Sequence, residues 1–129
     1  MLDAATGLER WRTDNTGEVG RFTMNEEDLF VGIGENVACL RRTSGALKWA
    51  QPTQQLVTGR PAADARHVYA GGVDSFVYAL RAHDGHVRWR FKTNGPVEAN
   101  VVLASGVVYA GSHDHKVYAL DTAEGERIW

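Results

Sequence analysis

The sequence has little of what defines several common classes of protein. Its one cysteine in 129 residues, Cys39, cannot form an internal disulfide framework or a cysteine-rich zinc site. Its longest apolar-rich run, residues 101–111, contains Ser105 and Gly106 and is far shorter than the about 18–20 residues of a membrane span. No stretch of about ten residues or more shows the apolar period of a helix. The sequence therefore predicts a globular chain of strands without a membrane span.

Positive charge is also dispersed along the chain. The 14 lysines and arginines are outnumbered by 16 aspartates and glutamates, and the formal net charge is −2. Arg41-Arg42 is the one adjacent pair of basic residues, which is not the basic patch of a nucleic-acid-binding protein. The first residues do not show the charged segment followed by an apolar one that is typical of a signal peptide. We therefore expect no nucleic-acid partner.

Motifs of catalysis and cofactor binding are lacking as well, since there is no GxSxG, P-loop, dinucleotide fingerprint or HExxH. The triplet His113-Asp114-His115 has metal-ligand side chains, but zinc usually takes three or four protein ligands, and aspartate is common in turns. The matching triplet Val73-Asp74-Ser75 lacks both histidines. We interpret these residues as a turn, and we expect no catalytic residue, no metal site and no cofactor.

What the sequence does contain is one short phrase repeated four times. In each copy a leucine stands five residues before a glycine, and the glycine stands four residues before a tryptophan. The four tryptophans of the chain are all used in this pattern and are 38, 40 and 40 residues apart. Such a fixed period indicates an array of structural repeats.

Between the copies lie short runs rich in valine, tyrosine and phenylalanine, which suit a half-buried strand and end at glycine or at a turn. They predict strands at residues 19–24, 28–32, 56–61, 67–72, 76–80, 86–91, 97–103, 107–112 and 116–120. Each period of about 40 residues then holds four short strands joined by tight turns, which describes a blade of a β-propeller.

The sequence therefore predicts an all-β fold, a partial β-propeller of three four-stranded antiparallel blades preceded by a half-blade hairpin. We place the half-blade at residues 1–12 and the three blades at 13–50, 51–90 and 91–129. A blade cannot bury both of its apolar faces alone, so neighbouring blades must cover them.

The repeated glycines and tryptophans are the residues to which we assign a role, and this role is structural. We expect each indole to dock on the neighbouring blade near a glycine turn, because four copies in register favour packing over the alternative of stacking on a ligand. The blade-docking residues are Gly7, Trp11, Gly45, Trp49, Gly85, Trp89, Gly125 and Trp129. Cys39 occupies the position of Ala79 and Ala119, which predicts a small buried residue.

The last copy, Ala119-Leu120-Asp121 with Gly125 and Trp129, resembles the tryptophan-docking repeat of the pyrroloquinoline-quinone (PQQ)-like propellers, which runs Ala-x-Asp-x-x-x-Gly-x-x-x-Trp. The first copy keeps the aspartate, threonine, glycine and tryptophan of that pattern, whereas Arg41 and Arg81 replace the aspartate in the middle copies. The resemblance covers the whole chain. The WD40 pattern fits less well, because no aspartate follows any of the tryptophans.

The resemblance implies a non-enzymatic scaffold that binds proteins or ligands, located outside the cytoplasm. Two alternatives stay open: a fragment of a PQQ-dependent quinoprotein dehydrogenase, and an extracytoplasmic sensor propeller of a bacterial kinase. The quinoprotein alternative implies an adjacent-cysteine disulfide beside the quinone, and this chain has no adjacent cysteines.

The chain begins and ends at the same point of the repeat, and Met1 stands where the motif has alanine. We therefore expect a segment of a longer propeller of about six to eight blades. The alternative is that copies of the chain associate to complete a ring. In either case the partners are further blades, and we expect the isolated chain to be oligomeric or poorly soluble because its end faces are apolar.

Overall fold

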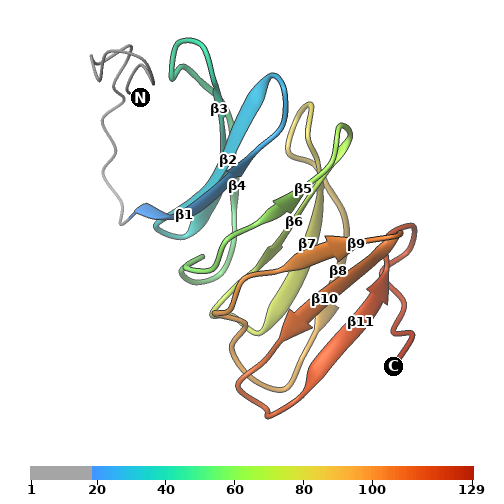
Figure 1. Ribbon diagram of the computed structural model, residues 1–129. Helices are drawn as coiled ribbons and strands as arrows, with labels where there is room; N and C mark the ends of the chain where they lie inside the picture. Colours follow the sequence, from blue (N-terminus) through green and yellow to red (C-terminus); the bar gives the residue numbers. More distant parts are fainter. Residues whose placement is uncertain (1–18) are drawn as a thin grey trace, which may run out of the picture.

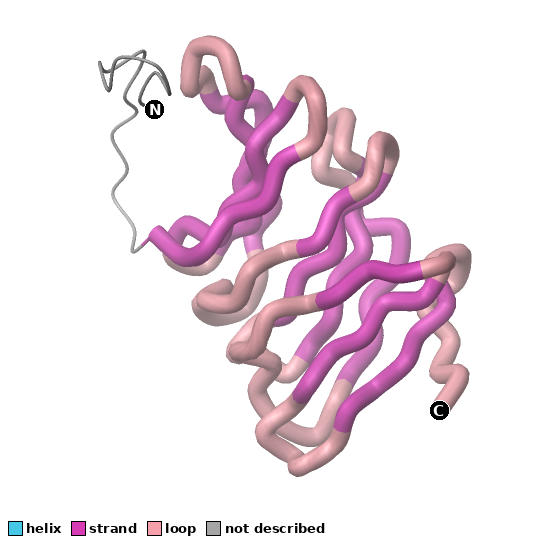
Figure 2. The backbone as a smooth tube through the Cα atoms, in the orientation of Figure 1, coloured by secondary structure: helices cyan, strands magenta, loops and turns pink. Residues whose placement is uncertain are grey.

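The computed structural model describes residues 19–129, which form strands and loops in three antiparallel sheets (Figures 1 and 2). The first sheet contains β1 (Val19–Met24), β2 (Asp28–Ile33), β3 (Asn36–Arg41) and β4 (Leu47–Pro52). The second contains β5 (Ala62–Ala63), β6 (His67–Gly71), β7 (Phe76–Arg81) and β8 (Val87–Lys92). The third contains β9 (Val102–Ala104), β10 (Val107–Gly111) and β11 (Val117–Asp121). Each strand pairs with the next one in the chain.

This arrangement confirms the predicted all-β fold and the partial propeller. The expected half-blade at residues 1–12, with Gly7 and Trp11, lies outside the described residues. Within residues 19–129 we find no helix with the length and hydrophobicity of a membrane span.

The third sheet differs from the predicted four-stranded blade. After β11 the chain makes one isolated bridge, between Leu120 and Arg127, and the backbone of Ala119 exchanges hydrogen bonds with Ile128 (2.7 Å) and Trp129 (3.0 Å). In the second sheet the tryptophan is the third residue of β8, and three more residues continue the strand. Trp129 is the last residue of the sequence, so the residues that would complete the fourth ladder are not part of it.

The prediction of strands at residues 56–61 and 97–103 was wrong in position. β5 begins only at Ala62 and β9 at Val102. The residues before them are apolar because they fill the space between sheets: Val57, Val97 and Val101 are buried. Their N–H groups bond singly to loops or to a neighbouring blade, as Val101 does to the carbonyl of Arg60 (3.0 Å), rather than in a ladder.

The core lies between the sheets. One cluster joins the first two sheets and includes Phe30, Val37, Cys39, Tyr78 and Leu80. A second cluster joins the second and third sheets and is built on the same pattern. Cys39 is fully buried, as expected, and burial, followed by the nearby Asp28 carboxylate, raises the pKa of its thiol to about 12. The middle strands are therefore buried on both faces.

The sheets converge along the edge formed by β1, β5 and β9, which contact one another in turn (Figure 1). We call this edge the inner edge. Glycines allow the backbones to approach there: a Cβ on Gly20 would lie 2.9 Å from the carbonyl oxygen of Val57, and one on Gly59 would lie 2.3 Å from that of Ala99. Since Gly20, Gly59 and Ala99 are 39 and 40 residues apart, each blade repeats the same close contact with the next.

Replacing Gly59 by alanine should therefore destabilise the fold by about 1–3 kcal/mol, because the added methyl group meets a backbone carbonyl that no rotamer change can move. Urea unfolding followed by tryptophan fluorescence measures the loss. Gly111→Ala is the matched control, since its Cβ would lie 4.0 Å from the nearest heavy atom, the Cβ of Ala99. Equal effects of the two substitutions would contradict the close approach.

Candidate functional site

Two tryptophans reach from one blade to the next. The indole N–H of Trp49, on β4, donates to the carbonyl of Ala82 (2.9 Å) in the second blade. The indole N–H of Trp89, on β8, donates to the carbonyl of Thr122 (3.0 Å) in the third. Both acceptors lie 33 residues after their tryptophan, immediately past the strands β7 and β11. The contact is therefore the same in both interfaces.

Two of the repeated glycines lie against these indoles. Gly85 and Gly125 have φ values of 77° and 73°, a left-handed conformation that favours glycine. A Cβ on Gly85 would lie 2.4 Å from the ring of Trp49, and one on Gly125 would lie 2.3 Å from that of Trp89. Glycine is thus required both by the backbone conformation and by the lack of space. The structure brings together these two glycine–tryptophan pairs.

The remaining members of the repeated set are placed differently. Gly45 has the same positive φ, 73°, in the first blade, but Trp11, the tryptophan that would match it, lies outside the described residues. Trp129 is 60% exposed and packs within its own blade against Tyr109, with ring centroids 6.0 Å apart. Its indole therefore lies on the open face of the third sheet.

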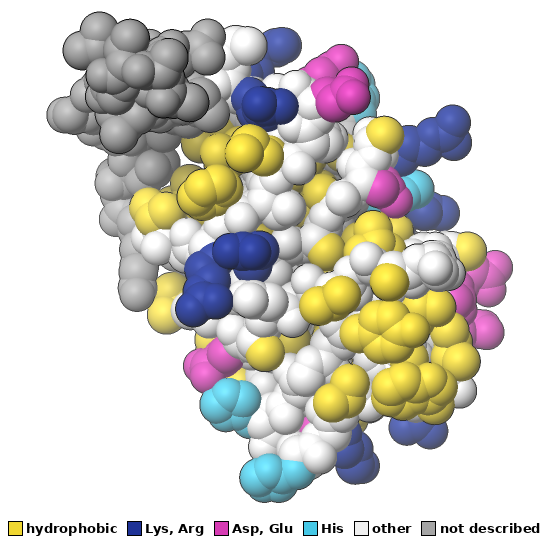
Figure 3. Space-filling model, in the orientation of Figure 1, with side chains coloured by type: hydrophobic (Ala, Val, Ile, Leu, Met, Phe, Trp, Pro, Cys, Tyr) yellow, Lys and Arg dark blue, Asp and Glu magenta, His cyan; other side chains and the backbone are white. Residues whose placement is uncertain are grey.

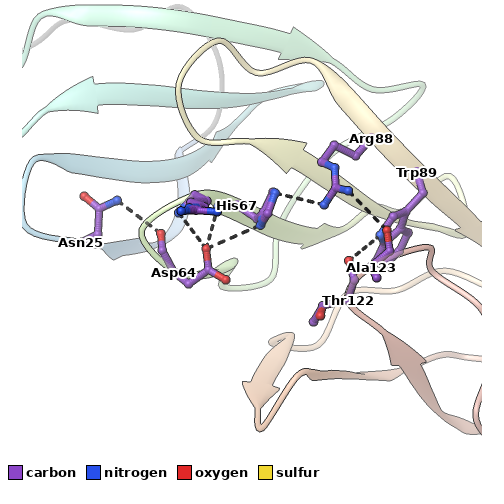
Figure 4. A network of polar contacts seen from close by, with 8 residues as sticks. Asn25, Asp64, His67, Arg88, Trp89, Thr122 and Ala123 are labelled. Carbon is purple, nitrogen blue, oxygen red and sulfur yellow. Dashed lines mark hydrogen bonds and ion pairs between the residues drawn. The ribbon is translucent and has the colours of Figure 1, made fainter.

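A second contact lies beside Trp89 at the same end of the blades (Figure 4). Arg88 donates from Nη1 to Nε2 of His67 (3.0 Å) and from Nη2 to the carbonyl of Ala123 (3.4 Å) in the next blade. His67 Nδ1 faces Asp64 Oδ1 at 3.8 Å. Burial, followed by the charge of Arg88, lowers the pKa of His67, although Asp64 opposes the shift. The neutral imidazole is the form that accepts the bond from Arg88.

The first interface carries different residues at the same positions. Asp28 and Lys48 take the places of His67 and Arg88, and they form an ion pair of 2.8 Å within the first blade. The equivalent bond across to the next blade is replaced by a cavity of about 680 Å³, which Asp28, Lys48 and His83 help to line. Sequence reasoning missed these pairs, although a spacing of 39 or 40 residues was the signal that could have found them.

The inner edge carries two arginines at equivalent positions. Arg21 and Arg60 are 39 residues apart, and Asn100 follows 40 residues later. The backbone N–H of Arg60 donates to Oδ1 of Asn100 (2.9 Å), which shows that these positions are neighbours in space. Arg21 and Arg60 line one hollow of about 560 Å³, beside the exposed Phe22 and Met24. The sequence analysis did not single them out.

The triplet His113-Asp114-His115 forms a turn whose residues have separate partners. His113 pairs with Glu98 (2.9 Å), and His115 has a positive φ of 70°. Asp114 accepts hydrogen bonds from the backbone of Lys116 (3.0 Å) and Asn94 (3.1 Å) and from the hydroxyl of Tyr118 (2.5 Å). Burial acts to raise the pKa of Asp114, but these bonds outweigh it and lower the pKa.

The preceding repeat uses its aspartate in the same way. Asp74 accepts hydrogen bonds from the hydroxyl of Tyr78 and from the backbone of Phe76 and Gln54. Because Gln54 follows β4, this aspartate ties its own turn to the segment that enters its blade. The two aspartates have a role in the turns of successive blades, which accounts for their presence without a metal.

The inner edge does not suit PQQ with calcium, the group that quinoproteins hold on the axis of their ring. Calcium takes oxygen ligands, chiefly carboxylates, whereas this edge presents Arg21 and Arg60. Cys39 is buried inside a blade and cannot flank a quinone. Over residues 19–129 no three histidines, cysteines, aspartates or glutamates are grouped to hold a metal ion. The residues present therefore do not fit this cofactor.

Replacing Trp89 by alanine should lower the free energy of unfolding by about 3–5 kcal/mol, because it removes a buried ring and leaves the carbonyl of Thr122 without its donor. Chemical denaturation measures the change. Trp129→Ala is the control: its exposed ring contacts only its own blade, so the loss should be about 1 kcal/mol or less. Similar losses for both variants would argue against docking by Trp89.

Stability should also depend on the protonation of His67. The folded pKa lies below the ordinary 6.5, so the unfolded chain binds the proton more tightly. The contribution of His67 is therefore fully present above about pH 6.5 and is lost as the pH falls through the folded pKa. Urea midpoints measured across this range should show a shallower pH dependence in His67→Gln than in the parent. The control His86→Gln, at an exposed turn, should keep the parent's slope.

Comparisons with known proteins agree with this geometry. The crystal structure of BamB from Moraxella catarrhalis matches with a TM-score of 0.86 at 23% identity, over 99% of this chain and 44% of that chain. The designed protein Ika8 matches with a TM-score of 0.86 at 15% identity, over 99% and 41% of the two chains. The designed protein Ika4 has the same TM-score and identity, over 96% and 79%. The chain thus spans less than half the length of the first two structures.

Sequence comparison gives the family. No curated protein matches the sequence of this chain. A family model described as outer membrane protein assembly factor BamB matches residues 1–129. Because this match covers every residue, the chain belongs to the PQQ-like β-propeller family that the model of outer membrane protein assembly factor BamB describes.

Proposed function

We propose that the chain acts as a non-enzymatic propeller scaffold that binds other proteins outside the cytoplasm. The observation that carries this proposal is the use of the repeated side chains. Trp49, Trp89, Gly85 and Gly125 are engaged in contacts between blades, which build a rigid frame and leave the loops at its ends to vary. The description of the family as an outer membrane protein assembly factor supports both the partner class and the location.

The titratable groups support a scaffold over an enzyme. Those with clearly shifted pKa values include Cys39, His67 and Tyr78, and each lies in a contact within or between blades rather than in a cleft. Tyr78 is an example: burial, followed by its hydrogen bond to Asp74, raises its pKa. A catalytic acid or base must reach a substrate proton, and these groups are turned to structural partners.

We further propose that more blades of the same repeat cover the open face of the third sheet. Val102, Val117 and Trp129 are exposed on this sheet, and Figure 3 shows hydrophobic side chains gathered over it. A large apolar patch marks an interface. The share of BamB that the chain covers, 44%, supports a complete ring of about twice this size. Those blades belong to the same longer chain or to a second copy.

Site-specific photo-crosslinking in the source cells tests the binding of proteins. A photoreactive residue in place of the exposed His83 or Glu124, at the turns that follow β7 and β11, should give one adduct of defined mass with the same partner protein. The control position is Val87, on the outer strand of the middle blade. If both turns give no adduct, or only what Val87 also gives, protein binding through these loops is wrong.

A further inference from the structure

The spacing of Arg21 and Arg60 is imposed by the backbone. Each follows a glycine, Gly20 or Gly59, whose missing Cβ lets the inner edge of its blade touch that of the next. Side chains that follow these contacts lie at matching points of neighbouring blades. Both guanidinium groups therefore border the same hollow of about 560 Å³, and Figure 3 shows Lys and Arg side chains gathered in the middle of this face.

The two positive charges lack partners of opposite sign within the described residues. No ion pair there includes Arg21 or Arg60. Glu98, whose backbone lies against Gly59, directs its carboxylate to His113 instead (2.9 Å). Asn100, the third residue of the series, uses its amide oxygen to accept the N–H of Arg60. Like charges held together in this way favour an anionic ligand.

The surroundings of the hollow indicate the kind of anion. Phe22 and Met24 line it together with the arginines and are 51% and 47% exposed. A bare phosphate or a nucleic-acid backbone has no use for this apolar surface. A polypeptide with acidic and apolar side chains satisfies both parts, since guanidinium groups bind carboxylates through paired hydrogen bonds and the aromatic ring packs against aliphatic groups.

We propose that the hollow on the inner edge binds an acidic, partly apolar segment of a protein partner, with its carboxylates on Arg21 and Arg60. This proposal rests on the proposed function, because it names the chemistry of the partner that the scaffold binds. The apolar side chains of the segment lie against Phe22 and Met24.

The test uses the whole chain and two fluorescein-labelled peptides, one alternating glutamate with leucine and the other glutamine with leucine. Fluorescence anisotropy should show saturable binding of the glutamate peptide only, weakening as salt is raised. The double variant R21Q/R60Q should bind it about tenfold more weakly or worse, since two charge-assisted pairs are lost. The variant R66Q/R127Q, with the same change in net charge at exposed positions away from the hollow, should bind like the parent.

Three outcomes would overturn the proposal: equal loss in both double variants, equal binding of the glutamine peptide, or displacement of the peptide by inorganic phosphate at matched ionic strength. All four arginines are exposed, so the variants should fold, and their thermal unfolding curves verify this. A partner found by crosslinking while the glutamate peptide fails to bind would overturn the acidic segment alone and keep the scaffold function.

Discussion

The structure depends on a contact between blades that combines one hydrogen bond with one missing side chain. A four-stranded blade has two apolar faces and cannot bury both by itself. Trp89 extends one blade to the carbonyl of Thr122 in the next, and Gly125 gives its ring the space it needs. Trp49 and Gly85 repeat the arrangement. Removing either partner opens the interface, so tryptophan and glycine recur together.

The inner edge follows from the same need for close approach, and it has a different chemical result. Backbone contact at Gly20 and Gly59 leaves no room for side chains between blades, so the next residues of the chain are displayed on the inner face. The blades share a frame but not these displayed residues, which are Arg21, Arg60 and Asn100. Packing fixes the frame, and the displayed positions are where a binding surface can differ from one propeller to another.

The sequence predicted the fold well because tryptophan and glycine have few substitutes in their positions and repeat at a visible period. It placed the strands before β6 and β10 wrongly, because Val57 and Val97 look the same whether they fill a ladder or a gap between sheets. It also missed the pair of His67 and Arg88 and the two inner arginines. Polar residues change from blade to blade, so only the register of the folded chain shows that they are equivalent.

The change from Arg88 to Lys48 gives the array a direction. The third blade is joined to the second by two residues, Trp89 and Arg88, whereas the second is joined to the first by Trp49 at the corresponding place, beside a cavity. In a stack where blades couple only to their neighbours, local opening starts at the weaker coupling. The interface between β4 and the turn at Ala82 is therefore where thermal fluctuations first separate the blades.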